Sequence, residues 1–196
     1  MRLRTDRLLL RPFAASDFDA MHAIHSDVGV VRYLYWEPRT ADEVREVLER
    51  KSRYTSLERP GDNLSFAVVL DATGELVGDC GLQWHDNEHR QGEIGFIVHP
   101  GHQGRGYATE AARAVLRIGF EETRLHRIVG RTEARNIASA RVLERLGMRR
   151  EAHLIENEYV KGEWQSELVY ALLDREWSTA RTGATGAAAR TTAPPG

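Results

Sequence analysis

The sequence has little of what disulfide-stapled, secreted or membrane-spanning proteins need. It contains a single cysteine, Cys80, which excludes an internal disulfide and a disulfide-framed secreted scaffold. No stretch approaches the roughly 18–20 consecutive apolar residues that a membrane-spanning helix requires. The first residues, from Met1 to Asp6, lack the long apolar stretch of a signal peptide. We therefore expect a cytoplasmic protein with no membrane partner.

An excess of one charge is also missing. The 27 basic and 29 acidic residues give a formal net charge of −2, so no global charge draws the chain to nucleic acid. The sequence also lacks a basic stretch that carries aromatic residues, and we expect no nucleic-acid partner. Its 41% hydrophobic content over 196 residues is enough for the core of one domain.

The C-terminal residues have the least to bury. From Ser178 to Gly196 the chain has no Val, Ile, Leu, Met or aromatic residue, and it ends in Pro-Pro-Gly. Such a segment cannot bury enough apolar surface to offset the entropy lost on ordering. We expect one folded domain over residues 1–177 and a disordered tail over 178–196.

Hydrophobic periodicity and turn residues predict a mixed α/β domain. Strands are expected near 8–10, 64–70, 76–84, 93–99, 128–132, 152–156 and 167–173. Helices are expected after an N-cap at Ser16, after a capping box of Thr40 and Glu43, over 107–120 and over 138–146. This order predicts a central, largely antiparallel sheet flanked by helices.

A glycine-rich loop follows the strand predicted at 93–99. Gly104 and Gly106 allow close approach of the backbone to a ligand, and the helix that begins at Tyr107 offers unpaired N–H groups. The pattern suits a diphosphate, although a surface turn rich in glycine looks the same. A P-loop is excluded because no Gly-Lys-Ser/Thr follows. The dinucleotide-binding pattern fails because Thr109 stands where a third glycine is due.

The loop and its surroundings resemble the GCN5-related N-acetyltransferase (GNAT) family over residues 3–177. The loop matches the family's Gln/Arg-x-x-Gly-x-Gly/Ala signature. The matching segments are Glu93-Ile94-Gly95-Phe96, Gln103-Gly104-Arg105-Gly106-Tyr107-Ala108, Thr109-Glu110-Ala111, Asn136-Ile137-Ala138-Ser139-Ala140-Arg141-Val142-Leu143 and Leu146-Gly147-Met148. Two end segments, 5–12 and 156–164, resemble the subgroup that acetylates the N-terminal alanine or serine of ribosomal proteins.

The resemblance implies a fold and a cosubstrate. The central sheet would splay between its fourth and fifth predicted strands, 93–99 and 128–132, and acetyl-CoA would lie in the gap. The pantetheine arm would pair with the backbone near 96–98, and the diphosphate would lie on the N–H groups of 104–108. The implied cofactor-binding residues are Phe96, Ile97, Val98, Gln103, Gly104, Arg105, Gly106, Tyr107, Ala108, Asn136 and Ser139.

Direct acetyl transfer needs a base for the amine, donors for the oxyanion and an acid near the departing thiolate. Ser139 is the expected donor to the sulfur, because the subgroup resembled here has a serine at this point. An equal interpretation is that Ser139 caps the helix that it begins. Asn136 is expected to orient the cofactor arm or to cap that helix.

Glu93 is the candidate base, acting directly or through water. Strand alternation would place Glu93, Gly95 and Ile97 on one face of the sheet. A solvated glutamate at the start of a strand is the plain alternative. Glu156 and Glu158 are rival bases, or parts of an acidic rim that attracts a cationic amine.

The function predicted is transfer of acetyl from acetyl-CoA to a primary amine. A protein or peptide N-terminus is the preferred acceptor, because both end segments of that subgroup are matched. A small amine, either an aminoglycoside or a polyamine, is the first alternative, and a non-catalytic CoA-binding module is the second. No metal is expected, because His22-x-x-His25 and His99-x-x-His102 lack a third ligand at metal spacing. A homodimer is left open.

Overall fold

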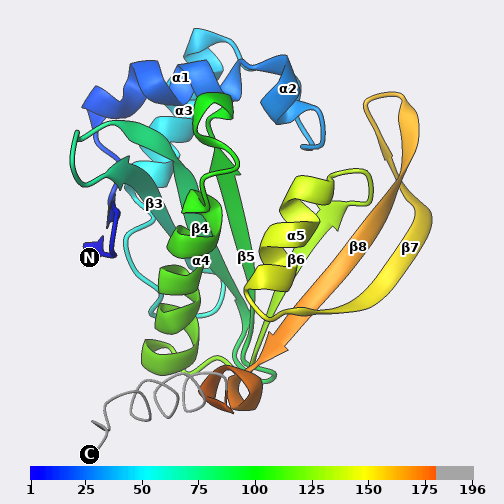
Figure 1. Cartoon of the computed structure of the whole chain (residues 1–196). Helices are drawn as coiled ribbons and strands as arrows, with labels where there is room; N and C mark the ends of the chain where they lie inside the picture. Colours follow the sequence, from blue (N-terminus) through cyan, green and yellow to red (C-terminus); the bar gives the residue numbers. More distant parts are fainter. Residues whose placement is uncertain (180–196) are drawn as a thin grey trace, which may run out of the picture.

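The structure, a computed structural model that describes residues 1–179, is built on one eight-stranded sheet (Figure 1). The strand order is β1-β2-β3-β4-β5-β6-β8-β7. The strands are β1 (Leu3–Arg4), β2 (Leu8–Arg11), β3 (Asn63–Leu70), β4 (Leu76–Asp86), β5 (Gln91–Val98), β6 (Arg127–Glu133), β7 (Arg149–Val160) and β8 (Glu163–Leu173). Every neighbouring pair is antiparallel except β5 and β6, which confirms the mixed, mostly antiparallel sheet.

Helices cover both faces of this sheet. They are α1 (Phe18–His25), α2 (Val28–Val31), α3 (Ala41–Ser52), α4 (Tyr107–Arg117) and α5 (Ile137–Arg145), with a π-helical turn at Ile118–Glu122 after α4. In Figure 1, α4 crosses in front of β4, and α5 lies against β6. Buried residues of α4 such as Ala112 and Val115 form one apolar stripe, and the helix packs against β4 and β5. On the other face, α1 and α3 enclose a second cluster that includes Met21 and Val44.

The sheet splits between β5 and β6. The two strands pair only from Gln91 opposite Arg127 to Glu93 opposite Val129, although β5 continues to Val98 and β6 continues to Glu133. Beyond this point, which we call the fork, β5 pairs only with β4 among the described residues. The splay expected between the fourth and fifth predicted strands is therefore present. These strands are β5 and β6 because the short β1 precedes those predicted.

Several boundaries differ from the predictions for local reasons. The N-cap predicted at Ser16 is wrong, because Asp17 accepts a hydrogen bond from the Ala14 backbone at 2.8 Å and Ser16 lies inside a 3₁₀ turn. The capping box of Thr40 and Glu43 is confirmed. Strand β7 runs far beyond the predicted 152–156. Its side chains are almost all exposed, so no apolar alternation marks it in the sequence.

The C-terminal part of the described chain ends in a helical turn over 174–179. Ser178 and Thr179 belong to this turn, so the boundary predicted at 177 falls inside it. The remainder of the predicted tail lies outside the described residues. Within residues 1–179, no helix is both long enough and apolar enough to cross a membrane.

Candidate active site

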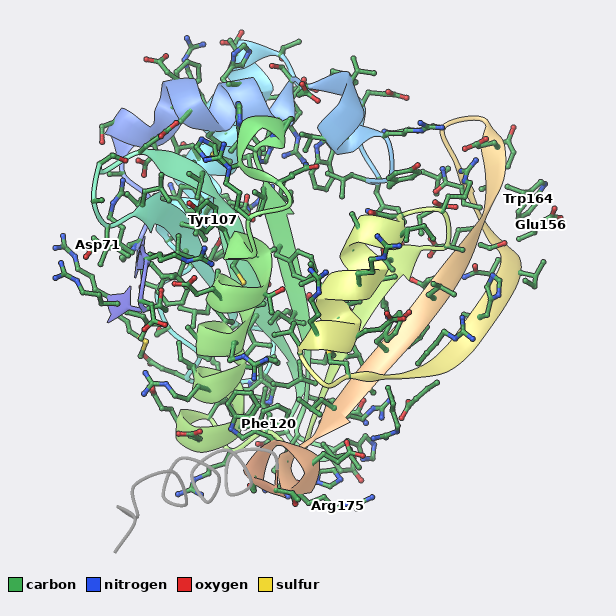
Figure 2. All side chains as sticks on the ribbon, viewed as in Figure 1. Asp71, Tyr107, Phe120, Glu156, Trp164 and Arg175 are labelled. Carbon is green, nitrogen blue, oxygen red and sulfur yellow. The ribbon has the colours of Figure 1, made fainter. Side chains whose placement is uncertain are left out.

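A cavity of about 410 Å³ opens at the fork. Its lining includes residues 93–97 of β5, Arg131, Thr132 and Glu133 of β6, the first turns of α5, and part of β8. The segment 33–36 closes it from the side of the N-terminal helices. Figure 2 shows side chains from these separate elements around the gap between β5 and α5. The fork therefore brings together residues from almost the whole length of the domain.

Glu93 is the last residue of β5 that pairs with β6, so it lies at the fork itself. Its carboxylate is one third exposed, with Arg131 Nε at 3.5 Å and His85 Nε2 at 3.7 Å. Burial raises the pKa of Glu93 above the usual glutamate value, against the opposing effect of Arg131 and His85. A partly buried carboxylate with a raised pKa is suited to accept a proton near neutral pH.

The floor of the cavity beside Glu93 is formed by two glycines and one small side chain. Ser65, Gly81 and Gly95 lie side by side in the register of β3, β4 and β5, and all three line the cavity. A Cβ added to Gly95 would meet no atom within 4 Å, so the missing side chain leaves open space. A Cβ on Gly81 would instead come within 2.6 Å of the Leu64 carbonyl oxygen. Every residue of β5 from Glu93 to Ile97 lines the cavity, but Ile97 packs on the second cluster whereas Ile94 and Phe96 pack on the first, as strand alternation requires.

Asn136 is the N-cap of α5. The Asn136 Oδ1 accepts a hydrogen bond from the Ser139 backbone at 3.1 Å, and the helix begins at Ile137. Ser139 is therefore the third residue of the helix and does not cap it. Both Asn136 and Ser139 line the cavity, across the fork from β5.

The glycine loop lies between β5 and α4, as predicted. Gly104 and Gly106 have φ values of 75° and 83°, in the left-handed region that favours glycine, and Gly106 is the N-cap of α4. The Gln103 side chain donates to the Val98 carbonyl at 3.0 Å and anchors the loop to the end of β5. The first backbone N–H groups of α4 therefore lie next to the open edge of β5, where they can donate hydrogen bonds to an anion.

Carboxylates outnumber cations in the cavity lining. The lining carboxylates are Asp79, Glu93, Glu133, Glu158 and Glu167, and the lining cations are Lys51 and Arg131. The two cations are each paired, Lys51 with Asp79 at 2.8 Å and Arg131 with Glu167 at 2.9 Å. Aromatic rings from Tyr33, Trp36 and Tyr54 complete the wall. This lining favours a cationic ligand through charge and through ring faces.

A buried charge cluster under this wall joins residues that are far apart in the sequence. Asp79 Oδ2 lies 2.8 Å from Lys51 Nζ and 3.6 Å from His25 Nε2, and His25 Nδ1 bonds Arg39 at 2.8 Å. Burial alone would raise the pKa of Asp79, but Lys51 and His25 outweigh it and hold that pKa at about 2. The ring of Trp36 stacks on His25 and lies 4.2 Å from Arg39, so the cluster holds the segment 33–36 against the sheet.

The two rival glutamates lie in different places. Glu156 is exposed on the outer side of the β7–β8 hairpin, where it points away from the cavity, as does Trp164 (Figure 2). Glu158 lines the cavity and accepts a hydrogen bond from the Tyr35 hydroxyl at 2.8 Å. Of the two, only Glu158 remains a rival to Glu93.

The N-terminal segment 5–12, one of the two that suggested a peptide acceptor, does not line the cavity. Its Arg7 side chain instead donates to the Arg105 carbonyl of the glycine loop at 3.0 Å. Its Arg11 pairs with Asp17 at 2.7 Å. The segment therefore supports the loop and the first helix, and it gives no information about an acceptor.

Comparison with known proteins agrees with this geometry. Residues 7–149 match the model of a family described as an acetyltransferase (GNAT) domain. The chain belongs to the GNAT family of N-acetyltransferases. Its activity is therefore acetyl transfer, and the family and fold predicted from the sequence are confirmed.

Three of its relatives show how far the similarity extends. The uncharacterised N-acetyltransferase YnaD of Bacillus subtilis is 35% identical over 179 residues, which cover 91% of this chain and 100% of YnaD. The spermidine N(1)-acetyltransferase of Vibrio cholerae is 28% identical over 159 residues, 81% of this chain and 88% of that enzyme. A crystal structure of a GNAT-family acetyltransferase from Bacillus anthracis has a TM-score of 0.80 at 33% identity and covers 90% of this chain and 100% of its own.

Proposed function

We propose that this N-acetyltransferase acts on a cationic primary amine at the fork, with Glu93 as the base and Ser139 as the donor to the sulfur. The observation that carries the proposal is that Glu93, the open edge of β5 and Ser139 line one cavity. A base, an anchor for the cosubstrate and a donor for the leaving group are the groups that direct acetyl transfer requires.

Acetyl-CoA fits the described surface in two ways. The unpaired backbone of β5 beyond the fork offers N–H and C=O groups to the amides of the pantetheine arm. The glycine loop and the start of α4 offer N–H groups to the diphosphate. The residues proposed to bind it are Phe96, Ile97, Val98, Gln103, Gly104, Arg105, Gly106, Tyr107, Ala108, Asn136 and Ser139. When bound, acetyl-CoA supplies the activated acetyl group.

Different residues of the chain then accept the proton of the amine, stabilise the oxyanion and donate to the leaving group. Glu93 takes a proton from the ammonium, directly or through a water, which leaves the neutral amine that can attack. Backbone N–H groups on the open edge of β5 donate to the oxyanion that forms. The Ser139 hydroxyl donates to the departing thiolate.

For the acceptor we propose a small polyamine ahead of a peptide N-terminus. Three of the five lining carboxylates are paired with a cation at 2.8–2.9 Å: Asp79 with Lys51, Glu167 with Arg131, and Glu133 with Arg135. The remaining two, Glu93 and Glu158, favour a substrate with more than one positive charge. The bare floor at Gly95 suits a slim, unbranched chain. The named activity of the Vibrio cholerae relative, spermidine N(1)-acetylation, belongs to the same class. The matched segment 156–164 still supports a peptide N-terminus as the competing prediction.

The test is free-thiol release from acetyl-CoA with a panel of polyamines, N-terminal peptides and aminoglycosides. We expect the highest kcat/KM with a polyamine. A higher kcat/KM with a peptide would replace the proposed acceptor and keep the proposed chemistry. CoA binding by calorimetry with no thiol release for any acceptor would favour a CoA-binding module.

Replacing Ser139 with alanine tests the donor to the sulfur. We expect Ser139→Ala to lower kcat roughly ten- to a hundredfold, the usual worth of a hydrogen bond to a charged group, with little change in KM for the amine. Initial rates of thiol release measure both constants, and Ser52→Ala is the control, because Ser52 is a serine of α3 that is half-buried like Ser139 but does not line the cavity. An unchanged kcat would limit Ser139 to a structural part of α5.

A further inference from the structure

The turn between β1 and β2 docks on the first turn of α4. One carboxylate, that of Glu110, receives the contacts: Thr5 Oγ1 donates at 2.6 Å and the Arg7 backbone N–H donates at 2.9 Å to its Oε1. The Arg7 guanidinium donates to Oε2 through Nε at 2.8 Å, with Nη2 at 2.7 Å. Burial would raise the pKa of Glu110, but these hydrogen bonds outweigh it and lower that pKa, so the carboxylate stays ionised.

The same guanidinium also reaches the glycine loop. Arg7 Nη1 donates to the Arg105 carbonyl at 3.0 Å, and its Cζ lies 4.8 Å from the centre of the Tyr107 ring. A Cβ added to Gly106 would lie 3.4 Å from Arg7 Nη2. Arg7 therefore lies against the loop on the side to which the Arg105 carbonyl points.

A planar trans peptide carries its C=O and N–H on opposite sides. Because Arg7 holds the Arg105 carbonyl, the N–H of Gly106 turns the other way, toward the anion-binding side of the loop. Two glycines in left-handed conformation, Gly104 and Gly106, would otherwise leave this peptide free to rotate. A ligand that binds a fixed loop does not have to order it, which improves affinity.

We propose that Arg7, held by Glu110 and Thr5, is a positioning residue that fixes the glycine loop for the diphosphate of acetyl-CoA. This inference rests on the proposed binding of acetyl-CoA at that loop. The contribution is geometric, because Glu110 neutralises the charge of Arg7. Lysine cannot replace it, since one ammonium does not present the forked donors that reach a carboxylate and a carbonyl together.

The experiment compares Arg7→Gln and Arg7→Lys with the wild type. We expect both variants to raise KM for acetyl-CoA and the calorimetric Kd for CoA roughly tenfold. The KM for the amine and kcat at saturating acetyl-CoA should not change. Arg4→Gln is the matched control, because Arg4 lies at the end of β1 before the same turn, its side chain is 69% exposed, and it pairs with Asp71 at 3.2 Å. It should behave as the wild type.

A second donor, S-acetylpantetheine, lacks the diphosphate and separates positioning from general damage. The Arg7 variants should keep the wild-type kcat/KM with this donor. Equal losses with both donors, or wild-type affinity for CoA in Arg7→Lys, would overturn the proposal. Thr5→Val, which removes a single bond to Glu110, should raise the Kd for CoA a few-fold and serves if the Arg7 variants fold poorly. Calorimetry measures the Kd for CoA without turnover, so this test gives a result even if no amine is acetylated.

Discussion

Replacing Glu93 with glutamine is expected to lower kcat by about a hundredfold or more, with the calorimetric Kd for CoA nearly unchanged. Glutamine keeps the size of the side chain but cannot take the proton of the attacking ammonium. Glu93 lies at the fork, away from the glycine loop, so the diphosphate contacts should survive. Initial rates of thiol release at saturating amine, with calorimetry on the same sample, measure the two effects.

The pH profile gives an independent readout of the same residue. Since burial raises the pKa of Glu93, the carboxylate is available as a base only above that raised pKa. In the wild type, kcat should therefore fall on the acidic side with a midpoint above 4.5, the ordinary glutamate value. This limb should be absent in Glu93→Gln.

Glu158→Gln is the matched control for Glu93, because Glu158 lines the same cavity but hydrogen-bonds the Tyr35 hydroxyl. It is expected to change KM for the amine more than kcat. If Glu158→Gln loses the acidic limb while Glu93→Gln keeps full turnover, Glu158 is the base and the assignment proposed here fails.

Replacing Gly95 with valine should reduce kcat/KM for the amine by at least about a hundredfold without loss of stability. A Cβ at this position meets no atom within 4 Å, so the fold has room for the side chain. Valine also favours a strand. The added methyl groups would stand on the bare floor beside Glu93, and displacement of a reacting amine by about 1 Å costs roughly this much.

Two neighbouring substitutions calibrate the result. Gly95→Ala should cause a smaller loss, in proportion to the volume added. Gly81→Ala should instead lower the midpoint of urea unfolding, because its Cβ would come within 2.6 Å of the Leu64 carbonyl. Wild-type kcat/KM for Gly95→Val would show that the acceptor does not cross this floor.

The parts predicted from sequence are those where the residues that matter are close together in the chain. The loop from Gln103 to Ala108 needs only two glycines and a following helix to define it. Asn136 and Ser139 share one helical turn. The resemblance to a known family added the splay of β5 and β6, because nothing in the apolar pattern of either strand marks where their pairing stops.

The parts that sequence could not predict depend on contacts between distant residues. Arg7 and Glu110 are 103 positions apart and carry no shared local pattern. Asp79 is the one acidic residue in the mostly buried inner half of β4, which is a usable sign, but the sequence does not name Lys51 and His25 as its partners. The preference for a peptide acceptor, drawn in part from segment 5–12, was limited in the same way. The resemblance of a segment to a subgroup does not show which residues that segment contacts.

The split of the sheet at the fork also bears on how the protein avoids aggregation. An unpaired strand edge is a template on which other chains can add strands. Here the unpaired edge of β5 faces inward, across a gap closed on its far side by α5 and the β7–β8 hairpin (Figure 1). This cover makes the open edge of β5 less accessible to a strand of another protein than an outer edge of the sheet is. The fold thus keeps an unpaired strand edge inside the molecule, where it can bind a ligand with a lower risk of strand addition.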